Sequence, residues 1–237
     1  HDRLWIIAKA GRQPQRQGKR MISWDKITTV LLDMDGTLLD LHFDNHFWLE
    51  HLPRRYAERH GLAPAAARAE LYRRFDAVKG TIDWYCIDYW TRELDLDIRR
   101  LKEEVAHLIA PHAGAIDFLI AVRASGRRAV LVTNAHTASL TLKLERTGID
   151  AHLDAVISAH DLGLPKEDTV FWSRLQEIEP YRPADTLFID DNAAVLASAR
   201  AAGLRHLLFV AQPDSRQDSR TAPDFPTLTR FSDILPA

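Results

Sequence analysis

Short runs of apolar residues recur along the chain, and amphipathic stretches lie between them. Five of these runs are continuous and rich in large aliphatic side chains: 28–32, 128–132, 155–158, 186–189 and 205–210. Such runs are typical of strands that are buried on both faces of a parallel sheet. Four helical patterns alternate with the later runs: 113–125, 137–146, 166–178 and 192–202. The alternation predicts an α/β fold with a doubly wound, Rossmann-like parallel sheet.

Residues 41–110 interrupt this alternation. They show helical periodicity without a convincing strand pattern, and they are rich in aromatic and charged side chains. A helical segment between the first two strands predicts an insertion that covers the sheet as a cap. We therefore expect an α/β core formed by residues 21–40 and 111–237, with a helical cap at residues 41–110.

The first twenty residues differ in composition from the rest of the chain. They hold six lysines and arginines and one acidic residue, Asp2, with glutamine and glycine between them. One interpretation is a basic arm that binds nucleic acid or a membrane surface. The interpretation that we favour is a leader, disordered or foreign to the native chain, with Met21 as the natural start.

Bulk composition narrows the class of protein without selecting a function. The 237 residues are 46% hydrophobic, and their formal net charge is −2, which gives no general attraction to nucleic acid. No apolar run approaches the ~20 residues that span a bilayer. The single cysteine, Cys86, favours a reducing compartment. We expect a cytoplasmic monomer or homodimer that acts on a small molecule, with neither nucleic acid nor a membrane as its partner.

Polar residues follow four of the five predicted strands at their carboxyl ends, where open α/β sheets bind ligands. They are Asp33 and Asp35 after the first strand, Thr133 and Asn134 after the second, Lys166 in the loop after the third, and Asp190 and Asp191 after the fourth. These residues are far apart in the sequence, but the predicted sheet would bring them to one rim.

The two carboxylates of Asp33 and Asp35, one residue apart, fit the two tasks of phosphate-ester hydrolysis. One can attack phosphorus, and the other can protonate the leaving oxygen and then deprotonate water. Gly36 lets the chain turn away sharply after them. The structural alternative is a strand that simply ends in an Asx turn.

Asp190 and Asp191 would crowd negative charge around Asp33, which predicts a bound cation. Mg²⁺ prefers oxygen ligands and commonly takes one or two carboxylates plus phosphate. Asp33, one member of the acidic pair and the main-chain carbonyl of Asp35 would form such a site. A helix N-cap is the alternative role for either member of the pair.

Phosphate could be held by residues that follow the second and third strands. The Thr133 hydroxyl and the helix start behind it can bind phosphate oxygens, and Lys166 can neutralise the phosphoryl group and the Asp33 anion. Asn134 and His136 are further candidates for reaching phosphate or sugar. The ordinary alternatives are a threonine that ends a strand and a lysine that is solvated at the surface.

Four segments, LLDMDGT, LVTN, GLPKED and FIDDN, resemble the motifs of the haloacid dehalogenase superfamily in order and spacing. The roles that this resemblance implies are nucleophile for Asp33, general acid and base for Asp35, phosphate binding for Thr133 and Lys166, and metal binding for Asp190 and Asp191. The second member of such an acidic pair usually contacts the metal in relatives, which favours Asp191. The dehalogenases themselves lack Asp35, so their activity is disfavoured here.

A closer resemblance, to the bacterial GMP/IMP 5'-nucleotidase branch, covers residues 24–212. It rests on segments such as DMDGTLLDLHFDN, WYCIDYW, LVTNAH and TLFIDDN. It implies an Mg²⁺-dependent phosphomonoesterase that hydrolyses purine 5'-monophosphates to nucleoside and phosphate. The alternatives are a phosphatase for another small metabolite, such as phosphoglycolate or a sugar phosphate, a phosphomutase, or a binding protein with a relic site.

The cap would recognise the leaving group, because the core motifs recognise only phosphate. Trp84, Tyr85 and Asp88 are candidates, since an aromatic face can stack on a purine and a carboxylate can accept its N1–H. The alternative, which we favour for any single aromatic residue, is a place in the hydrophobic core of the cap. His42 and His46 could bind zinc, but histidines at this spacing are more often exposed or hydrogen-bonded.

Overall fold

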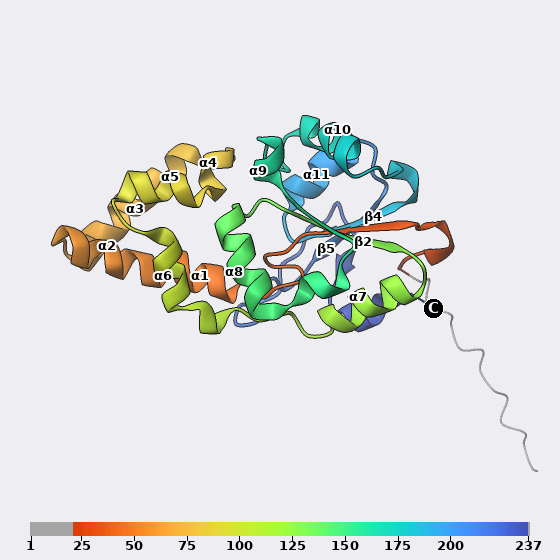
Figure 1. Ribbon diagram of the computed structural model, residues 1–237, viewed down its shortest axis with the longest axis horizontal. Coiled ribbons are helices and arrows are strands. Elements are labelled where there is room, and N and C mark those ends of the chain that lie inside the picture. The colour runs from red at the N-terminus through yellow and green to blue at the C-terminus, as the bar shows by residue number, and fades with distance from the viewer. Residues whose placement is uncertain (1–20, 237) are drawn as a thin grey trace, which may run out of the picture.

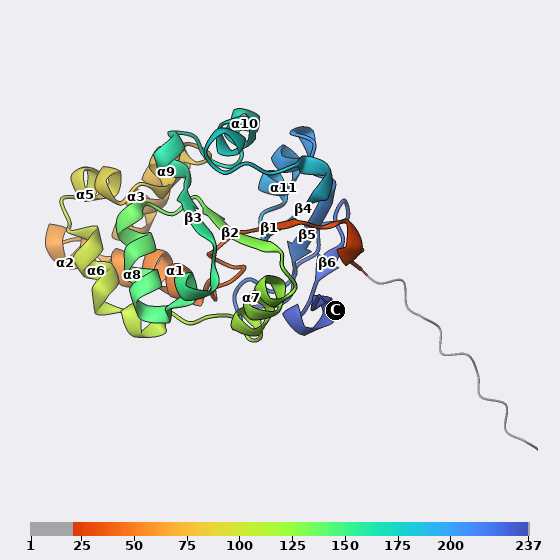
Figure 2. The same cartoon turned by 45° about the vertical axis from the view of Figure 1, so that its right-hand side comes forward.

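The computed structural model describes residues 21–236 (Figure 1). The basic leader, residues 1–20, lies outside the described residues, so its interpretation stays a prediction. Six parallel strands form one sheet in the order β3-β2-β1-β4-β5-β6 (Figure 2). Their bounds are β1 Thr29–Leu32, β2 Arg128–Thr133, β3 Ala155–Ser158, β4 Thr186–Asp190, β5 His206–Val210 and β6 Thr227–Leu228. The predicted fold is confirmed, and only the two-residue β6 was too short to leave a pattern.

Helices cover both faces of the sheet, as double winding requires. On one face lie α7 (Ala115–Ala124), α8 (Thr137–Thr147) and the 3-10 turn η6 (Phe231–Ile234). On the other lie α10 (Thr169–Ile178) and α11 (Ala193–Ala201), while the short α9 (Ala159–Leu162) follows β3. The remaining short turns of the core are η1 Trp24–Lys26, η4 Ile149–His152 and η5 Pro183–Asp185. No helix within residues 21–236 is long and apolar enough to cross a bilayer.

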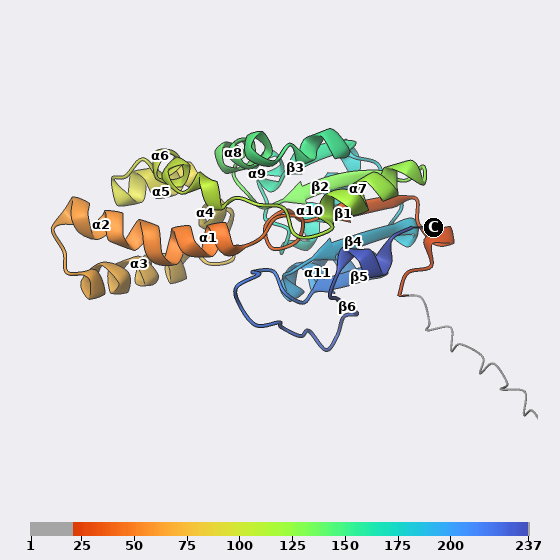
Figure 3. The same ribbon diagram turned by 90° about the horizontal axis from the view of Figure 1, so that it is seen from below.

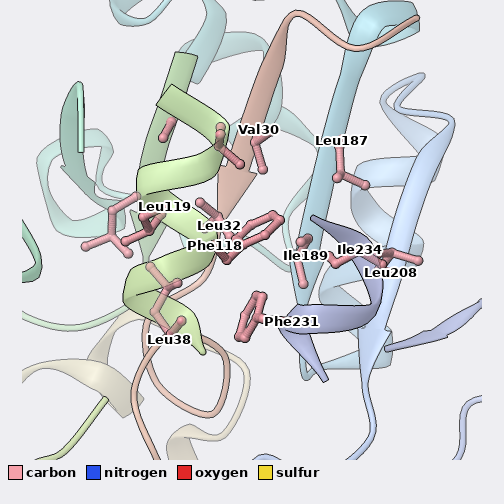
Figure 4. Close-up of a cluster of buried hydrophobic side chains, with 14 of the residues drawn as sticks. Val30, Leu32, Leu38, Phe118, Leu119, Leu187, Ile189, Leu208, Phe231 and Ile234 are labelled. Carbon is pink, nitrogen blue, oxygen red and sulfur yellow. The ribbon is translucent and has the colours of Figure 1, made fainter. Parts of the chain in front are cut away.

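Alternation along the central strand β1 divides the core into two hydrophobic clusters. Val30 and Leu32 face α7 and η6, where they pack in the cluster that contains Phe118 and Phe231 (Figure 4). Leu31 points to the opposite face and joins the cluster under α10 and α11. Because successive strand residues face opposite sides, a strand covered on both sides must be apolar throughout. This requirement explains the continuous apolar runs.

Residues 41–110 form helices and contain no strand. The elements are α1 His42–His46, the π-helical η2 Phe47–His51, α2 Leu52–His60, α3 Pro64–Val78, α4 Ile82–Tyr85, α5 Ile87–Leu94, α6 Ile98–Glu104 and η3 Ala106–Leu108. They enclose a separate hydrophobic cluster in which Phe43, Phe47, Phe75 and Trp90 are buried. We call this segment the cap. Figure 3 shows it beyond the carboxyl ends of the strands.

The two connections between cap and core run side by side. The backbone N–H of Asp40 donates to the carbonyl of Ala110 at 2.9 Å, and that of His112 donates to the carbonyl of Leu38 at 2.9 Å. The chain therefore leaves the core and returns to it at one place, directly after the Asp33–Asp35 loop. The cap is therefore joined to the core beside the candidate site residues Asp33 and Asp35.

Candidate active site

The parallel register of the sheet brings the predicted site residues to one rim. Leu32 of β1 pairs with Leu131 of β2 on one side and with Ile189 of β4 on the other, so the three strands end together. Asp33 follows immediately, and its N–H donates to the carbonyl of Ile189 at 3.0 Å. Asp190 is the last residue of β4. Side chains from separate crossovers therefore meet at this rim.

Lys166 is the buried cation at the centre of the rim. Its Nζ lies 2.6 Å from Oδ1 of Asp33 and 2.7 Å from Oδ2 of Asp190, and it donates to the carbonyl of Val132 at 3.1 Å. Burial opposes the charged form, but Asp190 and Asp33 outweigh burial and raise the pKa of Lys166. The ammonium group is therefore positively charged at neutral pH and holds the two carboxylates in place.

Three carboxylates, those of Asp33, Asp190 and Asp191, offer ligand oxygens that all lie within 4.8 Å of one another. Burial raises the pKa of Asp33 to about 7 against the opposing charge of Lys166. Burial, together with the charge of a neighbouring aspartate, likewise raises the pKa of Asp190 to about 6 and that of Asp191 to about 7. An all-oxygen set of this kind fits a hard divalent cation such as Mg²⁺.

Gly36 shows how closely the loop that carries Asp33 and Asp35 approaches the acidic pair. Its φ is +85°, and a Cβ at this position would lie 2.8 Å from Cγ of Asp191 and 2.9 Å from Cβ of Pro213. Glycine is the residue that combines this backbone conformation with so close an approach. The DxDG sequence thus reflects the packing of Asp191 against the loop as well as the turn.

The two predicted phosphate binders that follow β2, Thr133 and Asn134, make different hydrogen bonds from each other. Thr133 is buried, and its Oγ1 accepts a hydrogen bond from the N–H of Ala135 at 3.0 Å. Asn134 accepts from the N–H of Lys166 at 2.9 Å, and its Nδ2 donates to Oε2 of Glu167 at 2.9 Å. The contacts of Asn134 therefore position the loop that carries Lys166, a role that the sequence prediction did not include.

Asp35 belongs to a second buried charge network, which extends into the cap. Lys143 of α8 lies 2.7 Å from Oδ1 of Asp35 and 2.7 Å from Oδ2 of Asp44, and Lys102 of α6 lies 2.9 Å from Oδ1 of Asp44. Burial, with the charge of Asp44, raises the pKa of Asp35, although Lys143 opposes the shift. Burial would also raise the pKa of Asp44, but Lys102 and Lys143 outweigh it and lower the pKa.

A cavity of about 800 Å³ opens above the rim, between core and cap. Of the candidate substrate-binding residues, Trp84, Tyr85 and His136 line it. Asp88 does not; its side chain is 70% exposed and lies 3.5 Å from Nε2 of His136. The hydroxyl of Tyr85 donates to Oε1 of Glu167 at 2.6 Å, so the cap contacts the Lys166 loop directly.

Several residues of the site have no motif of their own in the sequence. They are Lys102, Lys143 and Arg220, while Asp44 and Glu167 lie inside quoted segments but were not singled out as site residues. Arg220 lies in the predicted core tail, 2.9 Å from Oδ2 of Asp191. The signal that could have found Lys143 and Lys102 is their position on the apolar side of a helical pattern, where an unpaired lysine is unfavourable. His42 and His46 instead face Asp214 and Glu50, and neither is in a metal-ligand cluster among residues 21–236.

Comparison with known proteins gives consistent matches. A family model described as haloacid dehalogenase-like hydrolase matches residues 27–203. The GMP/IMP nucleotidase YrfG of Escherichia coli (strain K12) is 41% identical over 216 residues, which cover 91% of this chain and 97% of that protein. The phosphoglycolate phosphatase of Chromobacterium violaceum is 24% identical over 189 residues, 75% of this chain and 82% of that protein. The crystal structure of a HAD phosphatase from Thermococcus onnurineus superposes with a TM-score of 0.73 at 19% identity, covering 88% of this chain and 96% of that one.

Proposed function

The chain belongs to the haloacid dehalogenase-like hydrolase family, and we propose that it is an Mg²⁺-dependent phosphatase that hydrolyses purine nucleoside 5'-monophosphates through a phosphoaspartate on Asp33. Membership of the family confirms the resemblance found in the sequence. The observation that carries the proposal is the meeting of Asp33, Lys166, Asp190 and Asp191 at one rim of the sheet, below a cavity with aromatic walls.

Asp33 is the nucleophile of the proposed reaction. A carboxylate oxygen of Asp33 attacks phosphorus, the bond from phosphorus to the ribose 5'-oxygen breaks, and the phosphoryl group moves onto the aspartate. Lys166, 2.6 Å from Oδ1 of Asp33, supplies positive charge for the attacking carboxylate and for the phosphoryl oxygens. The Thr133 hydroxyl, which accepts one hydrogen bond, retains its own proton to donate to a phosphoryl oxygen.

Asp35 is suited to the proton transfers. Its raised pKa favours a proton on the carboxyl group before the first step, which lets it protonate the departing 5'-oxygen. The resulting carboxylate then removes a proton from water, and the hydroxide attacks the phosphorus of the phosphoaspartate. The bond from phosphorus to Asp33 breaks, which releases inorganic phosphate and restores both carboxyl groups. Lys143, 2.7 Å from Asp35, stabilises the charged form between these steps.

The oxygen ligands at the rim fit Mg²⁺. Asp33 and Asp191 are the side chains that would hold it, with the main-chain carbonyl of Asp35. Asp190 is less available, because its Oδ2 pairs with Lys166 and its Oδ1 accepts from the N–H of Asn192 at 2.8 Å. When bound, the cation supplies charge that keeps the carboxylates ionised and lowers the repulsion between Asp33 and the phosphate dianion.

Two observations support a purine nucleotide as the substrate. The relative from Escherichia coli, which this chain matches over nearly its whole length, is a GMP/IMP nucleotidase. The cavity walls also carry the aromatic side chains of Trp48, Trp84 and Tyr85 from the cap, which offer faces for stacking a base above the phosphate site. Trp90 lines the same cavity but is itself buried in the cap core, as the alternative interpretation of these aromatics anticipated.

A panel of phosphate esters, with released phosphate as the readout, tests the proposal. GMP, IMP, AMP, phosphoglycolate and glucose 6-phosphate are each assayed with Mg²⁺ and with a chelator. We expect turnover of GMP and IMP to exceed that of the smaller esters and to disappear without the metal. Preference for phosphoglycolate, or phosphate transfer to a second sugar in place of release, would overturn the substrate assignment.

Two variants test the nucleophile. Asp33→Asn should abolish turnover while the protein remains folded, since the amide keeps the shape of the carboxylate. Asp76→Asn, an exposed aspartate of α3, is the matched control and should retain full activity. Undiminished turnover in Asp33→Asn would refute the role of Asp33.

A further inference from the structure

A second group of metal-ligating side chains lies at the seam between cap and core. Cys86 lies between α4 and α5 of the cap, His136 is the N-cap of α8, and His160 belongs to α9. One ligand atom from each lies within 4.8 Å of the other two. The two histidine rings have centroids 5.0 Å apart. Sulfur and imidazole nitrogen are soft and borderline ligands, unlike the oxygens around Asp33.

His160 presents an unused nitrogen to this group. Its Nε2 is buried and has no hydrogen-bond partner among the described residues. A buried polar atom without a partner is costly, by about 1–3 kcal/mol, and few are found in native proteins. A neutral imidazole nitrogen without a hydrogen-bond partner is the form of histidine that binds metals.

Cys86 supplies the sulfur from the opposite side of the seam. Its Sγ accepts a hydrogen bond from the N–H of Tyr89 at 3.4 Å and thereby caps α5. The side chain is half-buried, and it is the only cysteine of the chain. A metal ion displaces the thiol proton on binding, so the thiol need not be ionised beforehand.

We propose that Cys86, His136 and His160 bind a single Zn²⁺ ion, which links the cap to the core beside the catalytic cavity. Bonds of ~2.3 Å to sulfur and ~2.0–2.1 Å to nitrogen place the ligand atoms of a tetrahedral site roughly 3.3–3.6 Å apart. The three atoms, which lie within 4.8 Å of one another, therefore need to approach by at most ~1.5 Å.

The surroundings of His136 complete the site. The carboxylate of Asp88 lies 3.5 Å from Nε2 of His136 and is near enough to become the fourth ligand in place of water. One thiolate, one carboxylate and two neutral imidazoles would then balance the charge of Zn²⁺. When Nε2 of His136 binds the metal, the ring proton lies on Nδ1, which can then no longer accept the N-cap hydrogen bond from the N–H of Ala138. That hydrogen bond is long, at 3.3 Å.

Zn²⁺ at this seam would slow the proposed phosphatase. Cys86 directly follows Tyr85, whose hydroxyl contacts Glu167 beside Lys166. An ion that binds Cys86 together with the two core histidines would hold this part of the cap in place over the cavity. Turnover would slow because substrate entry and product release require the cap to move. The inhibition should persist at saturating Mg²⁺, because the two ions use different ligands.

The experiment uses the full chain, with Co²⁺ as an optical probe and Zn²⁺ as the competing ion. The variants are Cys86→Ser and His160→Gln, and Cys86→Ser keeps an N-cap for α5 because serine is a good capping residue. With the wild type we expect a thiolate-to-Co²⁺ absorption band that Zn²⁺ removes at one equivalent. Each variant should lose at least about 100-fold in Zn²⁺ affinity, exceeding the effect of losing an outer-shell partner. Without Zn²⁺, each should keep its Mg²⁺-supported turnover.

Three results would overturn the inference. One is the absence of a thiolate band in the wild type, and another is a band that His160→Gln leaves unchanged. The third comes from Asp191→Asn, a variant that removes a ligand of the acidic site. If this variant loses Zn²⁺ binding while Cys86→Ser keeps it, the ion binds at the acidic rim and not at the seam. Retained Zn²⁺ binding in Asp191→Asn supports the seam site even though that variant has no turnover.

Discussion

Replacing Lys143 with methionine tests whether the buried network around Asp35 stabilises the fold. Lys143 is 1% exposed, and its ammonium group makes two ion pairs of 2.7 Å, with Asp35 and with Asp44. Methionine retains the unbranched shape of the side chain but removes the charge, which leaves two buried carboxylates with Lys102 as the remaining cation. Breaking a buried ion pair by removing one partner costs about 3–5 kcal/mol.

Urea unfolding measures this loss. For a slope of about 2–3 kcal/mol per molar, the expected cost corresponds to a midpoint lowered by roughly 1–2.5 M. Lys79→Met, an exposed lysine at the end of α3, is the matched control, and its stability should change by less than about 0.5 kcal/mol. The loss of stability in Lys143→Met should also be smaller at pH 5 than at pH 8, because the unpaired carboxylates can take up protons at the lower pH.

A double-mutant cycle with Asp44→Asn separates pairing from packing. If Lys143 and Asp44 form the ion pair that the structure shows, the double variant should lose at least about 1 kcal/mol less than the sum of the single variants. Additive losses, or a loss below about 1 kcal/mol for Lys143→Met alone, would refute the view that Lys143 holds Asp35 and Asp44 together in the interior.

Further predictions concern the metal, the loop and the cap. In the metal-free protein the pKa values of Asp33 and Asp191 are raised to about 7, so Mg²⁺ must displace protons, and calorimetry should show its affinity falling at least about tenfold from pH 8 to pH 6. The same raised pKa values stabilise the metal-free fold at low pH, and thermal unfolding should show that contribution disappearing as the pH rises through about 7. Gly36→Ala should lower stability by about 1–3 kcal/mol and turnover by on the order of 100-fold, because the new Cβ meets Asp191 at a φ of +85°. Trp84→Ala should raise KM for GMP roughly 5- to 100-fold, as expected for a lost stacking contact, and leave KM for a small aryl phosphate nearly unchanged.

The sequence revealed the core of the fold because strands buried on both faces must be apolar throughout. The runs at 28–32 and 186–189 predicted β1 and β4 to within a residue at either end. Polar residues that directly follow such runs, such as Asp33 and Asp190, could then be placed on a common rim. The two-residue β6 was missed, because a pair of residues cannot display a periodicity.

Contacts between cap and core could not be predicted in the same way. Lys143 and Asp44 lie 99 positions apart, and nothing in their local patterns shows that they meet. Asp88 and Tyr85 occur in the same aromatic segment, yet only Tyr85 lines the cavity, because they belong to two separate short helices, α4 and α5, whose directions the sequence pattern does not give. Cys86, His136 and His160 approach one another only once the cap is placed on the core.

Mass spectrometry of a trapped enzyme tests the central claim, the phosphoaspartate on Asp33, most directly. Asp35→Asn is mixed with Mg²⁺ and an aryl phosphate, whose leaving group needs no acid, and the reaction is quenched in acid. Without the base that activates water, one phosphoryl group should remain on the peptide that contains Asp33. An unmodified peptide alongside released phenol, or a phosphoryl group on another residue, would contradict the account.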